Sequence, residues 1–246
     1  MDFPPCPISR MECIASIHDS MASWDSYVLY PIFKDQTAKS SSVAGAGKTK
    51  LVANVIDHFS NRPHNEALAY FYCNRNEELR RDPENVLRSF VKQLSISRDE
   101  QAIQDALVEI YKKKKRTGFS SAQLTYEEAE SLLSNLMQAY SRTTLVLDAL
   151  DECRESSRFA LIDTFGRLIT VSSQLKILIS SRRDQDIKLQ LEKKANIGIE
   201  ATDNQDDISK FVLVRINEDQ QRRRIALSDI LRKQIVETLL DKSRGM

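Results

Sequence analysis

The chain has 246 residues, enough for one large α/β domain or for one domain with attached pieces. Hydrophobic residues make up 41% and charged residues 29%, which is typical of a globular protein and excludes a disordered or fibrous chain. The 36 lysines and arginines nearly balance the 35 aspartates and glutamates, so the sequence predicts no membrane binding and makes nucleic-acid binding unexpected.

The N-terminus and the cysteines indicate a reducing compartment. Residues 1–14 are interrupted by three prolines and lack the apolar segment of a secretory signal. No apolar run approaches the roughly 20 residues that are needed to cross a bilayer. The four cysteines and three histidines form neither a CxxC pair nor the spacing of a metal site. The sequence therefore predicts a cytoplasmic protein without a structural zinc site.

The first 42 residues are expected to form a separate helical or linker segment. Residues 11–30 have the apolar spacing of an amphipathic helix, whereas residues 34–42 are polar and show no hydrophobic periodicity. The main domain is then expected over residues 43–203. Residues 204–246 are expected to form a C-terminal helical segment, the truncated start of a following helical region.

The apolar pattern from residue 45 onward alternates between helices and strands. Buried strands are predicted over residues 67–73, 143–149, 175–181 and 196–200. Helices are predicted over residues 48–59, 83–94, 99–111, 126–140, 157–171, 206–216 and 228–241. Strands that alternate with longer helices pair in parallel through right-handed crossovers, so the predicted fold is a three-layer α/β fold with a mainly parallel sheet.

The first motif with a chemical meaning is Gly45-Ala46-Gly47-Lys48-Thr49, at the start of a predicted helix. A glycine-rich turn that leads into a helix presents backbone N–H groups and the positive helix end to a polyphosphate. Lys48 would reach the β- and γ-phosphates, and the Thr49 hydroxyl would bind Mg²⁺. The alternative is a glycine turn that only caps the helix, followed by a solvated lysine.

The segment before this motif departs from the full P-loop pattern GxxxxGK[ST]. Ser42 stands where the pattern has glycine, and residues 37–41 are polar although a buried strand should precede the loop. We therefore expect a degenerate first strand that pairs weakly with the sheet. The alternative is that residues 27–33 (YVLYPIF) supply this strand.

Two further motifs place charged residues at the ends of predicted strands. Asp148 ends the strand TLVLD and would bind Mg²⁺ beside the phosphates, while Asp151 and Glu152 would position or polarise the attacking water. Arg182 ends the next strand, where ligands collect in open α/β folds, and would contact the γ-phosphate. The alternatives are a polar turn in which one acidic residue caps the next helix, and a solvated arginine.

These motifs, in this order, resemble those of the NACHT-type STAND ATPases, most closely the nephrocystin-like N-terminal NTPase domains of fungal NLR-like proteins. The matching stretches are GAGKTKLVANVIDHF (45–59), LAYFYC (68–73), TLVLDALDEC (144–153), KILISSR (176–182) and DDISKFV (206–212). The resemblance implies five parallel strands, ATP or GTP bound with Mg²⁺, and self-association with other STAND-type protomers. It also implies the Walker A roles for Lys48 and Thr49, the Walker B role for Asp148 and the sensor role for Arg182.

The leading functional hypothesis is a signalling switch that binds ATP or GTP and hydrolyses it slowly, as in fungal self/non-self or stress signalling. One alternative is a degenerate fragment that acts only as a protein-interaction module, which the polar residues 37–42 favour. The second is a P-loop kinase of a small molecule, although the acidic pair suits water activation better than acceptor binding. The basic run at residues 112–116 (KKKKR) is interpreted as a solvated helix end, and the alternative is a nuclear-localisation signal that would direct the protein to the nucleus.

Overall fold

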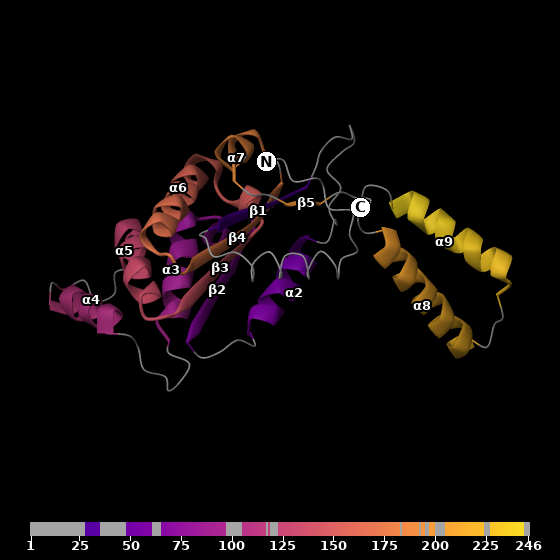
Figure 1. The fold of residues 1–246 in the computed structure, drawn as a ribbon, viewed down its shortest axis with the longest axis horizontal. Helices are drawn as coiled ribbons and strands as arrows, with labels where there is room; N and C mark the ends of the chain where they lie inside the picture. Colours follow the sequence, from indigo (N-terminus) through magenta and orange to yellow (C-terminus); the bar gives the residue numbers. More distant parts are fainter. Residues whose placement is uncertain are drawn as a thin grey trace. The chain divides into compact units, whose positions relative to one another are not determined.

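The computed structural model of the chain describes residues 28–34, 48–60, 65–96, 105–116, 118, 123–182, 184–191, 193–194, 197–199, 205–223 and 227–243. The strands are β1 (Val28–Lys34), β2 (Glu66–Tyr72), β3 (Arg142–Asp148), β4 (Leu175–Arg182) and β5 (Ile197–Ile199). The α-helices are α2 (Lys48–Ser60), α3 (Pro83–Leu94), α4 (Asp105–Arg116), α5 (Tyr126–Met137), α6 (Glu155–Val171), α7 (Gln185–Leu191), α8 (Gln205–Arg223) and α9 (Asp229–Ser243). Two short 3₁₀ helices, η1 (Glu78–Arg80) and η2 (Leu150–Glu152), follow β2 and β3 (Figure 1).

The strands form one five-stranded sheet in the order β2-β3-β4-β1-β5. Strand β3 pairs in parallel with both β2 and β4, and the register places Tyr72 opposite Asp148. This parallel arrangement confirms the predicted α/β fold. It also brings the carboxyl ends of β2, β3 and β4 to the same edge of the sheet, where ligands bind in open α/β folds.

The first strand of the sheet was expected in the wrong segment: β1 supplies it, and residues 37–41, where a degenerate strand was predicted, lie outside the described part of the chain. Strand β1 lies between β4 and β5 and is made of residues 28–34, almost as the alternative with residues 27–33 predicted. The P-loop pattern places the strand directly before the glycine turn. Here residues 35–47 separate β1 from α2, which is a longer connection than the pattern contains, so the strand was sought too close to the motif. The helix expected over residues 11–30 is also wrong at residues 28–30, and residues 11–27 lie outside the described part of the chain.

Two sets of side chains cover the two faces of the sheet. Leu145 and Leu147 of β3 and Ile177 and Ile179 of β4 belong to a buried cluster with residues of α3, α5, α6 and α7. Side chains of a strand alternate between faces, so the buried Val146 of β3 points to the face opposite this cluster. Helix α2 lies across the sheet from α3, α5 and α6 (Figure 1). The apolar residues of α2 are also buried: Leu51, Val52, Val55, Ile56 and Phe59. The sheet with helices on both faces is the predicted three-layer arrangement.

Local signals account for the helix starts around this core. Asp82 is the N-cap of α3 and accepts a hydrogen bond from the Glu84 N–H at 3.1 Å, while Pro83 occupies the first helical position. Thr125 and Glu128 form a capping box at the start of α5. These short-range contacts explain why the sequence predicts the starts of both helices to the residue.

Helix α4 packs against the buried cluster through Leu107 and Ile110. Four basic residues of the run at 112–116 form the last turn of α4, as the helix-end interpretation predicts, and Lys114 pairs with Glu128 at 2.7 Å. Helices α8 and α9 contact each other and belong to one compact unit of the chain, while α3 to α7 belong to a second unit. No helix in the described part of the chain is long and apolar enough to cross a membrane.

Candidate functional site

The structure brings together the two residues that the sequence assigned to a metal ion. Thr49, in the first turn of α2, donates a hydrogen bond from its hydroxyl to Oδ2 of Asp148 at 2.7 Å. Asp148 is buried at the end of β3. Gly45, Ala46 and Gly47 lie outside the described residues, as does the side chain of Lys48. The helix that follows the glycine motif therefore begins beside the carboxyl end of β3.

Ser180 is a second partner of Asp148, and the sequence analysis did not identify it. This fully buried serine of β4 donates to Oδ1 of Asp148 and accepts a hydrogen bond from the Ala149 N–H at 2.9 Å. Ala149 has a φ of 58°, in the left-handed region, which costs a residue with a side chain about 1–2 kcal/mol. The contacts of Ser180 stabilise this turn and orient the Asp148 carboxylate.

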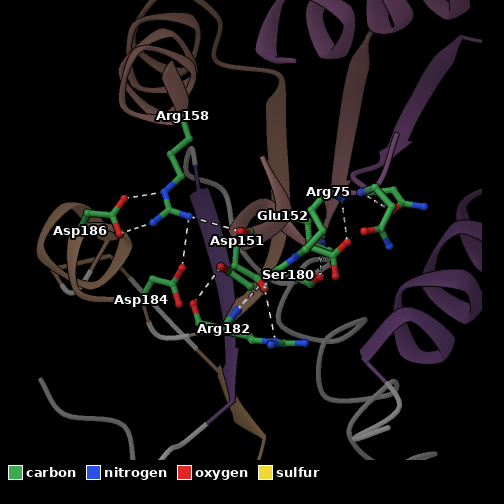
Figure 2. A network of polar contacts seen from close by, with 12 residues as sticks. Arg75, Asp151, Glu152, Arg158, Ser180, Arg182, Asp184 and Asp186 are labelled. Carbon is green, nitrogen blue, oxygen red and sulfur yellow. Dashed lines mark hydrogen bonds and ion pairs between the residues drawn. The ribbon is translucent and has the colours of Figure 1, made fainter. Parts of the chain in front are cut away.

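Asp151 lies in η2, immediately after this turn, and contacts two arginines (Figure 2). Its Oδ1 accepts a hydrogen bond from the Arg182 N–H at 2.9 Å, and its Oδ2 lies 3.4 Å from Nε of Arg182. The same Oδ2 lies 3.6 Å from Nη2 of Arg75, which follows β2. The structure therefore brings Asp151 and Arg182 together, as predicted residues of one site, and adds Arg75 to them.

Glu152 has different surroundings from its acidic neighbour. Its side chain is half-buried, and its Oε2 accepts a hydrogen bond from the backbone N–H of Arg75 at 3.3 Å. Among the described residues this carboxylate has no ion pair, whereas Asp151 has two. Of the two acidic residues, Glu152 is therefore the one that is available to a ligand or a water molecule.

Arg158 of α6 connects the η2 turn to the segment that follows β4 (Figure 2). Its guanidinium forms two bonds of 2.5 Å with Asp186 and one of 3.2 Å with Asp184, and it donates to the carbonyl of Asp151 at 3.3 Å. Burial opposes the charge of Arg158, but the carboxylates of Asp186 and Asp184 outweigh this effect and raise its pKa. This network stabilises the backbone around the two residues Asp151 and Arg182.

Two free thiols are buried next to these residues. The Sγ atoms of Cys73 and Cys153 lie 3.2 Å apart. The contact with Cys153 and burial both raise the pKa of Cys73, so the thiol stays protonated at neutral pH. Cys73 is therefore a packing residue rather than a nucleophile.

Two solved structures have a fold similar to that of this chain. The Walker-type ATPase PABY2304 of Pyrococcus abyssi superposes with a TM-score of 0.56 at 12% identity, over 96% of this chain and 66% of that chain. Cdc6p of Pyrobaculum aerophilum superposes with a TM-score of 0.51 at 14% identity, over 87% of this chain and 51% of that chain. At these identities the likeness concerns the fold alone, and the fold is that of the P-loop NTPases.

Comparison of sequences identifies a relative with a higher identity than these solved structures, and a protein family. The vegetative incompatibility protein HET-E-1 of Podospora anserina is 29% identical over 172 residues, which cover 68% of this chain and 12% of that protein. The chain thus spans about an eighth of the length of this relative. The family model described as Nephrocystin 3, N-terminal, matches residues 34–182, which include every predicted site residue. Because this match covers more than half of the sequence, the chain belongs to the nephrocystin 3 N-terminal family.

Proposed function

We propose that this chain binds a nucleoside triphosphate together with Mg²⁺ and hydrolyses it slowly, as part of a signalling switch. The observation that carries the proposal is the contact of 2.7 Å between the Thr49 hydroxyl and the Asp148 carboxylate. One group comes from the start of a helix and the other from the end of a buried strand. A hydroxyl and a carboxylate in this arrangement are the protein groups that bind Mg²⁺ in P-loop NTPases.

The residues present fit a magnesium ion. Mg²⁺ prefers oxygen ligands, and Thr49 and Asp148 both supply them. The buried Asp148 carboxylate has no ion pair among the described side chains, so a cation would offset its charge. Ser180 would keep this carboxylate in place, because its hydroxyl bonds to the oxygen atom that Thr49 does not contact.

The other predicted residues complete the proposed site. The N–H groups of Gly45, Ala46 and Gly47 and the Lys48 ammonium would bind the phosphates of ATP or GTP. Glu152 would polarise the attacking water, and Arg182 would contact the γ-phosphate. Asp151, assigned to the water by the sequence, is better placed as the partner of Arg182.

The signalling role is supported by the relative in Podospora anserina, whose name connects it with vegetative incompatibility. A self/non-self or stress response in which protomers of this type associate is the corresponding role for this chain. The alternative of an interaction module depended on a degenerate first strand, and β1 removes that support.

The proposal is tested by titrating a fluorescent ATP analogue and a fluorescent GTP analogue against the wild type and Lys48→Ala. Loss of a charge-assisted contact to phosphate should cost about 1.5–3 kcal/mol, or about a 10- to 150-fold loss of affinity. Lys50→Ala is the matched control, because Lys50 is an exposed lysine of the same helical turn. Equal affinities of Lys48→Ala and the wild type for both analogues would exclude the site.

A further inference from the structure

We propose that Arg75 and Arg182 together form a binding site for the terminal phosphate of the nucleotide, with Asp151 as the residue that positions both arginines. The proposal rests on the proposed function, since it concerns the same nucleotide. The sequence already predicts that Arg182 contacts the γ-phosphate, because it ends a strand at the edge of the sheet where ligands collect. Arg75 is assigned by the structure alone.

The sheet places the two arginines on either side of β3. Strand β2 ends at Tyr72, which is the register partner of Asp148, and Arg75 follows three residues later. Arg182 is the last residue of β4, on the other side of β3. Because the three strands are parallel, both arginines lie at the edge of the sheet that carries Asp148.

Asp151 contacts both guanidinium groups from the buried side. Its side chain is only 3% exposed, whereas the side chains of Arg75 and Arg182 are 54% and 34% exposed. A single nitrogen of each guanidinium lies near Oδ2 of Asp151, at 3.6 and 3.4 Å. Each guanidinium has five N–H donors, so with respect to the described residues most of the donors of both arginines remain for a ligand.

The charges favour a phosphate group in this position. The two guanidiniums carry two positive charges, and the carboxylate that contacts both carries one negative charge. Guanidinium groups bind phosphate oxygens through paired hydrogen bonds that are stronger and shorter than the present contacts of 3.4 and 3.6 Å. A phosphate can therefore gain contacts with both arginines without displacing Asp151.

The neighbouring Glu152 indicates which phosphate is bound. Its carboxylate accepts the Arg75 N–H, and it is the residue assigned to the attacking water. That water must lie in line with the γ-phosphate, so the arginines beside Glu152 are placed for the terminal phosphate. The arrangement would make the site distinguish a nucleoside triphosphate from the diphosphate, as a switch requires.

The test compares dissociation constants for ATPγS and ADP, and for GTPγS and GDP, in the wild type, Arg75→Ala and Arg75→Gln. We expect both variants to bind the triphosphate analogue about 10- to 150-fold more weakly and the diphosphate as the wild type does. Arg154→Ala is the control, because Arg154 is an exposed arginine that pairs with Glu78 instead of Asp151, and it should change neither constant. The glutamine variant separates the loss of charge from the loss of the side chain.

Lys48→Ala, measured in the same series, separates failure of this inference from failure of the proposed function. If Lys48→Ala weakens both nucleotides while the Arg75 variants bind the triphosphate normally, the two-arginine site is wrong and the nucleotide site stands. An equal loss of triphosphate and diphosphate affinity in the Arg75 variants would also overturn the assignment to the terminal phosphate. If Lys48→Ala and the Arg75 variants all match the wild type, the nucleotide site itself is wrong.

Discussion

Replacing Glu152 with glutamine should lower the rate of nucleotide hydrolysis by about 10²–10⁴-fold, the usual contribution of a general base. Glutamine keeps the shape of the side chain but cannot accept the proton of the attacking water. Nucleotide affinity should be preserved, because the carboxylate of Glu152 contacts only the Arg75 backbone among the described residues. Steady-state phosphate release and a binding titration on the same preparation measure the two quantities.

Glu155→Gln is the matched control for this experiment. Glu155 is exposed in the first turn of α6, three residues from Glu152, so the same chemical change there should leave the rate unchanged. A Glu152→Gln variant that hydrolyses nucleotide at the wild-type rate would remove this residue from the mechanism. Asp151 would then be the remaining candidate of the acidic pair.

Replacing Arg158 with alanine should cause the largest loss of stability at the site, about 2–3 kcal/mol. Breaking a buried ion pair from one side costs about 3–5 kcal/mol, and we expect less here because Asp184 and Asp186 are 39% and 36% exposed. The Arg158 side chain is 4% exposed, and its removal leaves both carboxylates and the Asp151 carbonyl without this partner. Urea denaturation of the wild type and the variant measures the difference.

The control for Arg158 lies on the same helix. Arg167 also contacts two carboxylates, those of Glu130 and Asp163, but its side chain is 50% exposed. Arg167→Ala should therefore leave the urea midpoint close to that of the wild type. A similar midpoint for both variants would show that the burial of the Arg158 network does not contribute to stability.

The loss of stability in Arg158→Ala should depend on pH, because Arg158 pairs with the carboxyl group of Asp186. Its burial acts to raise the pKa of the carboxyl group, but the bond to Arg158 outweighs this effect and lowers the pKa below its ordinary value of 3.8. A carboxyl group with a lowered pKa in the folded state stabilises the protein above its ordinary pKa, and this contribution is lost as the pH falls through the lowered value. The stability difference between the wild type and Arg158→Ala should therefore be constant near neutral pH and shrink below pH 3.8.

The elements that the sequence predicted well are those specified by their own residues. Helix α3 has a capping aspartate, a proline at its first position and an apolar stripe, and its predicted bounds are exact. Strands β2, β3 and β4 are short apolar runs between polar turns, and each was placed within one residue at either end. Helix α7 was not predicted, because its seven residues are too few to show a helical period and it is stabilised by the burial of Ile187 and Leu191.

Strand β1 could not be placed with certainty because its position depends on the rest of the sheet. The P-loop pattern assumes that the strand directly precedes the glycine turn, whereas residues 35–47 lie between β1 and α2 here. The apolar run at residues 27–33 was the available signal. Its role follows only from pairing between β4 and β5, which no local pattern reports.

In the site, too, the sequence predicted the residues that belong to local motifs and missed those that are brought in by contacts between distant segments. Thr49, Asp148 and Arg182 belong to recognisable motifs, and the structure brings Thr49 to Asp148 and Arg182 to Asp151. The other residues of the site contact these motifs from elsewhere in the sequence. Ser180 bonds to Asp148 across 32 residues, and Arg75 contacts Asp151 across 76 residues. Arg158, seven residues after Asp151, bonds to its carbonyl from α6. Only knowledge of the parallel register of β2, β3 and β4 would have predicted that Ser180 and Arg75 belong to the site.

The central claim is that Thr49 and Asp148 bind one Mg²⁺ ion together with the nucleotide, and calorimetric titration of ATPγS and GTPγS tests it most directly. The titration is made in Mg²⁺ and in EDTA, with the wild type and with Asp148→Asn, which keeps the size of the side chain and removes its charge. The account predicts that the wild type binds at least one analogue much more tightly in Mg²⁺ than in EDTA, and that Asp148→Asn loses most of this difference. A wild type with the same affinity in both buffers, or an Asp148→Asn variant with the full effect of Mg²⁺, would contradict the account.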